Sequence, residues 1–243
     1  MKASQRLLAI ATLATLVALP SQAATWSTSE QYGSWTTGSY TLYNNIWGSG
    51  AGPQTMWANS SSNWGVWADH PATSGIKSYP NASRYIGKKI SAINTLKSTV
   101  SATTPSGGMW TSTYDVWDAS HDHEIMIWLN YTAAAGATSG LPQPISYNWT
   151  AAGYAQPVYT NVTVGGATWN IFRGDNTSNL VYSFIRTTKT NNTTVDIKAI
   201  LNWLISKGWM SDTTLGEVQY GFEISQSSGG KNFTTNAYSV TSN

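Results

Sequence analysis

Two glutamates lie inside segments of the chain whose apolar residues alternate as they do in a half-buried β-strand. In the first segment, residues 124–130 (EIMIWLN), the two isoleucines and the leucine occupy every second position. Because successive side chains of a strand point to opposite faces, these three belong in the core. The other face then carries Glu124, Met126, Trp128 and Asn130. A carboxylate beside a thioether and an indole makes a poor solvent-facing surface and a good groove floor.

The second segment, residues 218–225 (VQYGFEIS), places its valine, tyrosine, phenylalanine and isoleucine on one face. The same alternation puts Gln219, Gly221, Glu223 and Ser225 on the other. Gly221 removes a side chain next to Glu223, which predicts that another group approaches the backbone closely. The alternative for either glutamate is a solvent-facing position on a half-exposed strand. The pattern around Glu223 fits both interpretations, whereas a solvent-facing Glu124 would leave Trp128 exposed without a purpose.

A third acid, Asp115, lies in the β-rich segment YDVW and shares a strand face with Trp117. Aspartate is disfavoured inside strands unless its carboxylate has a partner. Asp115 is therefore a candidate to hydrogen-bond a catalytic carboxylate and to tune its ionisation.

Two carboxyl groups in one groove can hydrolyse a glycosidic bond. One must be ionised to attack the anomeric carbon, and the other must hold a proton for the leaving oxygen. When the two groups lie about 5–5.5 Å apart, the configuration is retained through a covalent glycosyl-enzyme. A groove of low dielectric constant also drives the pKa values of two neighbouring acids apart.

Other chemistries have weaker support in the sequence. The run His121-Asp122-His123 would place both rings on one face of a regular strand, as in some metal sites, but Glu124 would lie on the opposite face. The sequence has no G-x-S-x-G motif and no glycine-rich phosphate loop. It also has no cysteine, which excludes thiol nucleophiles and thiolate metal sites. We therefore expect no metal and no cofactor.

Composition indicates an uncharged partner. Charged residues make up only 10% of the chain and aromatic residues 12%, including 13 tryptophans and 13 tyrosines. These rings either fill an aromatic-rich core or line a groove in which flat faces stack on sugars, and the low charge favours the groove. Without Lys2 and Arg6 the 13 basic residues become 11, equal to the acids. This balance argues against nucleic acid and against a polyanionic substrate.

Short segments rich in Thr, Val, Tyr, Trp and Ile, separated by Gly, Asn, Ser and Pro, predict one all-β domain over residues 24–243. Their spacing is typical of a sandwich or barrel. The predicted strands include residues 38–47, 107–117, 124–131, 167–173, 180–186, 217–225 and 233–240. Residues 195–207 instead carry apolar residues along one helical face. Thr193 and Asp196 form a capping-box pattern before this predicted helix, and Gly208 is a natural stop after it.

The start of the chain has the pattern of an export signal. Lys2 and Arg6 precede an apolar run over residues 7–19, and Pro20 and small residues follow it. This pattern predicts a bacterial signal peptide over residues 1–23, cleaved near Ala23. The run is shorter than the roughly 20 residues that span a bilayer. We therefore expect a secreted, soluble monomer with no membrane partner.

Five short motifs, in order along the chain, resemble glycoside hydrolase family 12, the small endoglucanases. EIMIWL from Glu124 resembles the family's nucleophile strand, and YGFE ending at Glu223 resembles its acid/base strand. YDVW around Asp115 is similar to the segment whose Asp hydrogen-bonds the nucleophile. Residues 43–48 (YNNIWG) resemble the segment whose Trp stacks on a glucose, and residues 76–81 (IKSYPN) match another stretch of bacterial members. The departures are Ile after Glu124, no disulfide near the N-terminus, and FEI where many members have TEP.

The resemblance, which runs from about Trp26 to the C-terminus, implies a β-jelly roll. Two curved, mostly antiparallel sheets would carry one packed helix and an open cleft that admits the middle of a β-1,4-glucan. By analogy Glu124 is the nucleophile, Glu223 the acid/base and Asp115 the residue that holds Glu124. The glucan would be bound by Trp47, Asn45, Trp128, Met126 and, more remotely, Tyr32.

Three alternatives stay open beside a cellulose or β-glucan endoglucanase. The first is a xyloglucan-specific member of the same family, which accommodates xylose branches. A sister jelly-roll family that cuts xylan fits less well, because its two catalytic strands read differently. Outside enzymes, an aromatic groove on this fold would suit a carbohydrate-binding module, although such modules rarely need two groove carboxylates on separate strands.

Overall fold

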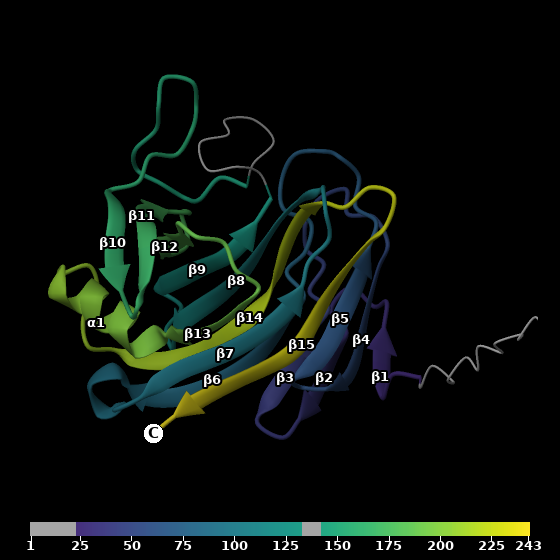
Figure 1. Ribbon diagram of the computed structural model, residues 1–243, viewed down its shortest axis with the longest axis horizontal. Helices are drawn as coiled ribbons and strands as arrows, with labels where there is room; N and C mark the ends of the chain where they lie inside the picture. Colours follow the sequence, from purple (N-terminus) through teal and green to yellow (C-terminus); the bar gives the residue numbers. More distant parts are fainter. Residues whose placement is uncertain (1–22, 133–141) are drawn as a thin grey trace, which may run out of the picture.

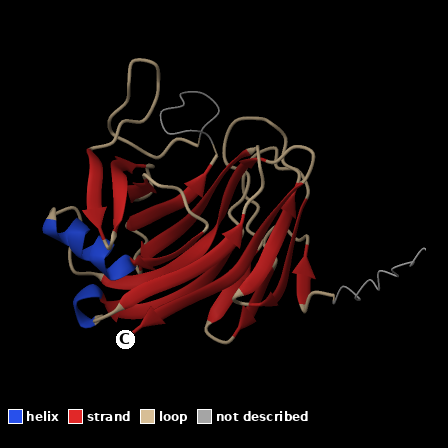
Figure 2. Cartoon of the chain, in the orientation of Figure 1, coloured by secondary structure: helices blue, strands red, loops and turns tan. Residues whose placement is uncertain are grey.

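The computed structural model of the chain describes residues 23–132 and 142–243. Within them two β-sheets lie against each other, and one α-helix flanks an end of the larger sheet (Figure 1). Figure 2 shows how far strands dominate this part of the chain. The predicted all-β jelly roll with one packed helix is confirmed. The predicted leader, residues 1–23, lies outside the described residues except for Ala23.

Each sheet has a defined strand order. The six-stranded sheet runs β1 (Trp26–Thr28), β4 (Gln54–Ser60), β5 (Asn63–Ala68), β15 (Lys231–Ser242), β7 (Leu96–Thr103) and β13 (Asn192–Asp196). The nine-stranded sheet runs β10 (Tyr159–Val164), β11 (Ala167–Asp175), β12 (Leu180–Arg186), β9 (His123–Tyr131), β8 (Met109–Asp118), β14 (Thr214–Gln226), β6 (Asn81–Lys89), β3 (Tyr40–Tyr43) and β2 (Ser34–Thr37). A short 3₁₀ helix, η1 (Ile90–Ala92), and α1 (Ile197–Ser206) complete the described elements.

Among the described strands the pairings are antiparallel with one exception. β9 pairs antiparallel with β8 on one side and parallel with β12 on the other. In the parallel pair Leu180 is level with His123 and Val181 with Glu124, so β9 and β12 start side by side. A parallel pair requires a long crossover, and here the crossover contains β10 and β11.

The core lies between the two sheets. The two isoleucines and the leucine of residues 124–130 are fully buried there, and so are all four apolar side chains of residues 218–225. Each such side chain contributes about 1.5–3 kcal/mol when fully removed from water. The alternation predicted for both segments is thereby confirmed on their core faces. This burial fixes the register, because a slip of one residue would turn the glutamates inward.

Alternation fails at one position. Asn130 was predicted to share a face with Glu124, but it donates to Asn191 Oδ1 at 2.8 Å. The pairing of β8 with β9 shifts between Ser112 and Thr113, which leaves Leu129 without an opposite residue. Such a bulge re-aims the side chains beyond it, so the prediction for Asn130 is wrong.

The helix is shorter than predicted. Thr193 belongs to β13, and α1 begins only at Ile197, where the Asp196 side chain accepts a hydrogen bond from Ala199 N at 3.0 Å. Asp196 is thus the N-cap itself, and the predicted capping box from Thr193 is wrong. Gly208, with φ of +66°, follows the helix as expected. Among the described residues no helix is both long and apolar enough to cross a bilayer.

Most predicted strands match observed ones to within a few residues. Residues 180–186 coincide with β12, and residues 124–131 differ from β9 by one residue. Residues 38–47 do not form one strand, because β3 ends at Tyr43. Two residues later Asn45 has a φ of +43°, a conformation that extended strands do not use.

Candidate active site

A cavity of about 870 Å³ lies on the face of the nine-stranded sheet that points away from the core. Its floor comes from β8, β9 and β14, the strands that carry the three acids singled out in the sequence. The carboxyl groups in its lining are Asp115, Asp122, Glu124 and Glu223. The aromatic rings in its lining are Trp47, Tyr79, Trp117 and Trp128.

The three predicted acids lie on a diagonal across neighbouring strands. Glu124 of β9 lies directly opposite Trp117 of β8 in the pairing of these two strands. Glu223 of β14 is level with Thr111 of the same strand. Asp115 lies on β8 between these two levels. Strand pairing therefore brings two glutamates that are distant in sequence to either side of a central aspartate.

Glu124 is held by a neighbour from outside the floor. Asn179, the residue before β12, donates from Nδ2 to Glu124 Oε2 at 3.0 Å. Asn179 is itself held by Asn176, whose side-chain oxygen accepts a hydrogen bond from Asn179 N at 2.9 Å. A neutral amide donor favours the ionised carboxylate and fixes its orientation.

The environment separates the ionisation of the two glutamates. Burial raises the pKa of Glu223 to about 8, and the negative charge of Glu124 contributes to the rise. Burial also raises the pKa of Glu124, but the hydrogen bond from Asn179 opposes this shift. A proton at neutral pH is thus stabilised on Glu223, while Glu124 has a donor that favours its charge.

Asp115 is buried, and one of its carboxyl oxygens, Oδ1, lacks a hydrogen-bond partner among the described residues. Burial raises the pKa of Asp115 well above its usual range, and the charges of Glu124 and Glu223 add to the effect. The predicted hydrogen bond to a catalytic carboxylate is not among the described contacts. Asp115 instead interacts with both glutamates through charge.

Glycine allows the close packing around Glu223. A Cβ on Gly221 would lie 2.2 Å from the carbonyl oxygen of Pro80. That oxygen accepts a hydrogen bond from Phe222 N at 3.1 Å. The close approach predicted beside Glu223 is confirmed, and the approaching group is the protein's own backbone.

Four of the five predicted glucan contacts line the cavity, namely Asn45, Trp47, Met126 and Trp128. Trp47 is 50% exposed and so presents a ring to solvent at the cavity wall. Its position is set by Trp47 N and Gly48 N, which both donate to Lys77 O. A Cβ on Gly48 would lie 1.9 Å from Ile76 O, so two of the sequence motifs pack directly together.

Tyr32 is not in the cavity lining. It is 66% exposed on the turn between β1 and β2 and accepts a hydrogen bond from Gln31 Nε2 at 3.2 Å. The turn that carries Tyr32 is joined to the segment before Trp47 by a backbone hydrogen bond, in which Ile46 N donates to Gln31 O at 2.9 Å.

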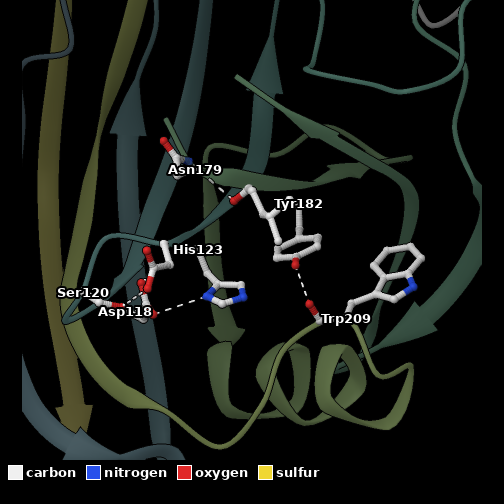
Figure 3. Close-up of polar contacts among 8 residues, drawn as sticks. Asp118, Ser120, His123, Asn179, Tyr182 and Trp209 are labelled. Carbon is white, nitrogen blue, oxygen red and sulfur yellow. Dashed lines mark hydrogen bonds and ion pairs between the residues drawn. The ribbon is translucent and has the colours of Figure 1, made fainter. Parts of the chain in front are cut away.

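The histidine run forms no metal site. His121 has a φ of +59° and lies before β9, so the regular strand assumed for a His-x-His pair is absent. Its ring lies 3.2 Å from Glu217 Oε2, whereas His123 Nδ1 lies 3.3 Å from Asp118 Oδ2. Figure 3 shows His123 turned toward Asp118 and Tyr182. Among residues 23–132 and 142–243, no three His, Asp or Glu side chains gather as a metal centre would require.

Several residues of the cavity were not predicted. Asn179, Gln143 and Ile145 come from loops whose sequences carry no periodic pattern. Gln219 and Trp117 do have a signal, because they share strand faces with Glu223 and Asp115. Strand alternation placed both side chains on these faces from the sequence, but they were not assigned to the site.

Comparison with known proteins gives a consistent result. The model of "Glycosyl hydrolase family 12" matches residues 38–243. A "Probable xyloglucan-specific endo-beta-1,4-glucanase A" of Aspergillus fumigatus is 33% identical over 249 residues, which cover 96% of this chain and 98% of the relative.

Solved structures agree with the sequence comparison. The xyloglucanase domain of NopAA, a type three effector from Sinorhizobium fredii in complex with cellobiose, superposes with a TM-score of 0.88 and 49% identity. The match covers 90% of this chain and 100% of that domain. A native family 12 xyloglucanase from Bacillus licheniformis superposes with a TM-score of 0.73 and 26% identity over 90% of this chain and 100% of its own.

Proposed function

The chain belongs to glycosyl hydrolase family 12, and from this premise we propose that it is an endo-β-1,4-glucanase that uses Glu124 and Glu223 as its catalytic pair. The observation that carries the assignment is the pair of carboxyls that line one cavity: burial raises the pKa of Glu223 to about 8, whereas a hydrogen bond from Asn179 opposes the effect of burial on the pKa of Glu124. A carbohydrate-binding module has no use for such a pair, because burying each carboxyl costs stability.

The proposed reaction has two displacements. Glu124 attacks the anomeric carbon while Glu223 gives its proton to the leaving glycosidic oxygen, which leaves a glycosyl-enzyme ester on Glu124. Glu223, now ionised, then removes a proton from water, and the resulting attack breaks the ester with net retention. A pKa of about 8 suits the first role of Glu223 at neutral pH. It falls for the second role, because Glu124 is then esterified and uncharged.

Two further residues are assigned to support Glu124. Asn179 is proposed as a positioning residue, since its amide donates to Glu124 Oε2 and favours the charged nucleophile. Asp115 is proposed to hold a proton between the two glutamates, because both of their charges raise its pKa. A neutral Asp115 can donate to Glu124, whereas an ionised one would only repel it.

The glucan is proposed to lie across the cavity on aromatic and polar side chains. Trp47 offers an exposed ring face, with Asn45 beside it. Trp128 lines the cavity but is only 2% exposed and its indole N–H is buried, so its proposed contact with the glucan is through the part of the ring that borders the cavity. Met126 completes this wall, and Tyr32 is a contact only for a chain that extends past Trp47.

The direct test measures new reducing ends from mixed-linkage β-glucan, carboxymethylcellulose and xyloglucan. We expect cleavage of at least one polymer, and the first product seen by NMR should be the β-anomer. An α-anomer would contradict retention. Binding without release of reducing ends from any of the three would favour a binding module instead.

A second candidate is specific action on xyloglucan. Its support is the name of the Aspergillus fumigatus relative and the descriptions of two structural neighbours, all of which specify xyloglucan. The same panel tests it, because a xyloglucan-specific enzyme leaves carboxymethylcellulose intact. Export by residues 1–23 and a monomeric state belong to the proposal and are checked by N-terminal sequencing of culture medium and by sedimentation.

A further inference from the structure

The six-stranded sheet carries two tryptophans on its outer face. Trp57 of β4 and Trp67 of β5 point away from the core, because the residues next to them in sequence are fully buried. We call the surface around them the tryptophan face. It consists of Ser27, Thr55, Trp57, Trp67, Asn232 and Thr234. The cavity belongs to the other sheet, and strands of packed sheets lie about 10 Å apart.

Both indoles pack closely against a glycine. A Cβ on Gly65, which is paired directly with Trp57, would lie 2.6 Å from that ring. A Cβ on Gly230 would lie 2.7 Å from Nε1 of Trp67. Each ring therefore packs on a glycine at a distance that leaves no room for a side chain there. Trp67 is 37% exposed in this position.

The indole N–H groups of these two residues have no acceptor among the described contacts. Trp110, Trp149 and Trp169 each donate to a backbone carbonyl oxygen. For Trp57 and Trp67 no acceptor is among the described contacts, and the N–H of the half-buried Trp57 does not belong to the buried unpartnered atoms. The N–H of Trp57 is thus accessible to solvent, whereas Nε1 of Trp67 lies toward Gly230. Partly exposed indoles with an accessible donor suit a ligand with apolar faces and hydroxyl edges.

The absence of charged side chains from this surface limits the chemical class of ligand that it can bind. Every member of the tryptophan face is uncharged. Its polar members offer hydroxyls and an amide, and Asn232 is level with Trp67 across the sheet. A nucleic acid would require cations here, and a polyanionic glycan would as well.

We propose that the tryptophan face is a second, non-catalytic binding site for a neutral β-glucan chain. It would hold the polymer while the cavity cleaves it, so the inference rests on the proposed function. Two other roles compete with it. The rings could serve only to cover two glycines, as aromatic side chains do in other sheets. The face could also bind a second copy of this chain.

The test uses full-length Glu124→Gln protein, which leaves the polymer intact, and affinity electrophoresis in gels containing mixed-linkage β-glucan. Trp47→Ala is added to weaken the cavity, so that residual retardation reports the outer face. We expect Trp57→Ala with Trp67→Ala to weaken this residual binding about tenfold. The matched control, Trp57→Phe with Trp67→Phe, keeps two flat rings over the glycines and should retain most of the binding.

Residual retardation that is unchanged in the double alanine variant overturns the proposal in favour of a covering role. A wild-type dimer that the double variant dissociates, with no change in glucan binding, overturns it in favour of self-association. On a short soluble cello-oligosaccharide the double variant of the active enzyme should keep its kcat/KM. If the wild type releases no reducing ends from any glucan, the proposed function fails, while retardation still decides the inference.

A second measurement avoids any dependence on folding of the tryptophan variants. The Glu124→Gln protein, which keeps every tryptophan, is oxidised with N-bromosuccinimide with and without mixed-linkage β-glucan, and the modified tryptophans are located by mass spectrometry. Occupation of the face should slow oxidation of Trp57 and Trp67 as well as that of Trp47. Protection of Trp47 alone would overturn the proposal.

Discussion

Two aspartates of β8 are both buried, yet their surroundings drive their ionisation in opposite directions. Asp118 accepts hydrogen bonds from His123 N and from the Ser120 hydroxyl, and His123 lies beside it. These contacts outweigh burial and lower its pKa. Asp115 has an unpartnered Oδ1 and two glutamates nearby, so burial and charge raise its pKa.

The surroundings of Asp118 are those of a structural acid, whereas the surroundings of Asp115 and Glu223 are those of the proposed reactive site. Around Asp118 the chain supplies donors to the carboxylate, and Figure 3 shows Ser120 and His123 next to it. No such donors to Asp115 or Glu223 are among the described contacts, and burial raises the pKa of both groups. Such an arrangement costs stability and is retained where chemistry needs it.

The largest expected effect is at Glu124, the proposed nucleophile. Glu124→Gln should lower kcat/KM on polymeric glucan by about 10⁴-fold or more, because no ester can form on an amide. Initial rates at matched folded concentration, judged by near-UV circular dichroism, measure it. If the loss stays below about tenfold, Glu124 does not carry the reaction.

Glu223→Ala should cost about 10²–10⁴-fold on polymer, since the leaving oxygen then departs without a proton. An aryl cellobioside with a good leaving group needs less acid assistance and should be cleaved with a smaller loss. Equal losses on both substrates would argue that Glu223 only shapes the cavity.

The two kinds of acid should respond oppositely to neutralisation. Asp118→Asn should lower the free energy of unfolding at pH 7 by about 1–3 kcal/mol, because a charged acceptor of several donors is removed. Its pKa is depressed, so its stabilisation is present above its ordinary pKa of 3.8 and disappears as pH falls through the folded value.

Glu223→Gln should instead stabilise the fold at neutral and alkaline pH. The pKa of Glu223 rises from 4.5 to about 8 on folding, so its burial becomes increasingly unfavourable as pH rises through that window. Thermal unfolding at pH 4 and pH 8 measures both variants, at roughly 2–4 °C per kcal/mol. If Glu223→Gln instead lowers the stability of the fold at pH 8, the proposed contrast between Asp118, whose charge stabilises the fold, and Glu223, whose charge destabilises it, is wrong.

The smallest effect is expected at Asn179. Asn179→Ala should lower kcat/KM about tenfold and move the acidic limb of its pH profile upward, because Glu124 loses a donor to its charged form. Asn179→Asp should move the limb further in the same direction. An unshifted limb in both variants would assign Asn179 a purely structural role.

Strand alternation predicted the floor of the site from sequence because its physical basis is local. Residues 124–130 and 218–225 bury their apolar halves, so Glu124 and Glu223 must take the other face. Local rules failed where the backbone departs from regularity, at the bulge that re-aims Asn130 and at His121 with its positive φ. They also fail for Asn179, whose contact with Glu124 depends on how two distant segments pair.

The parallel pairing of β9 with β12 has a consequence for how such a site can change over evolutionary time. Because the two strands start together, the residue before β12 arrives next to Glu124 whatever the length of the intervening crossover. Insertions or deletions in that crossover would reshape the wall that holds Gln143 and Ile145. Changes in the length of this crossover can therefore alter substrate preference without changing the contact between Asn179 and Glu124.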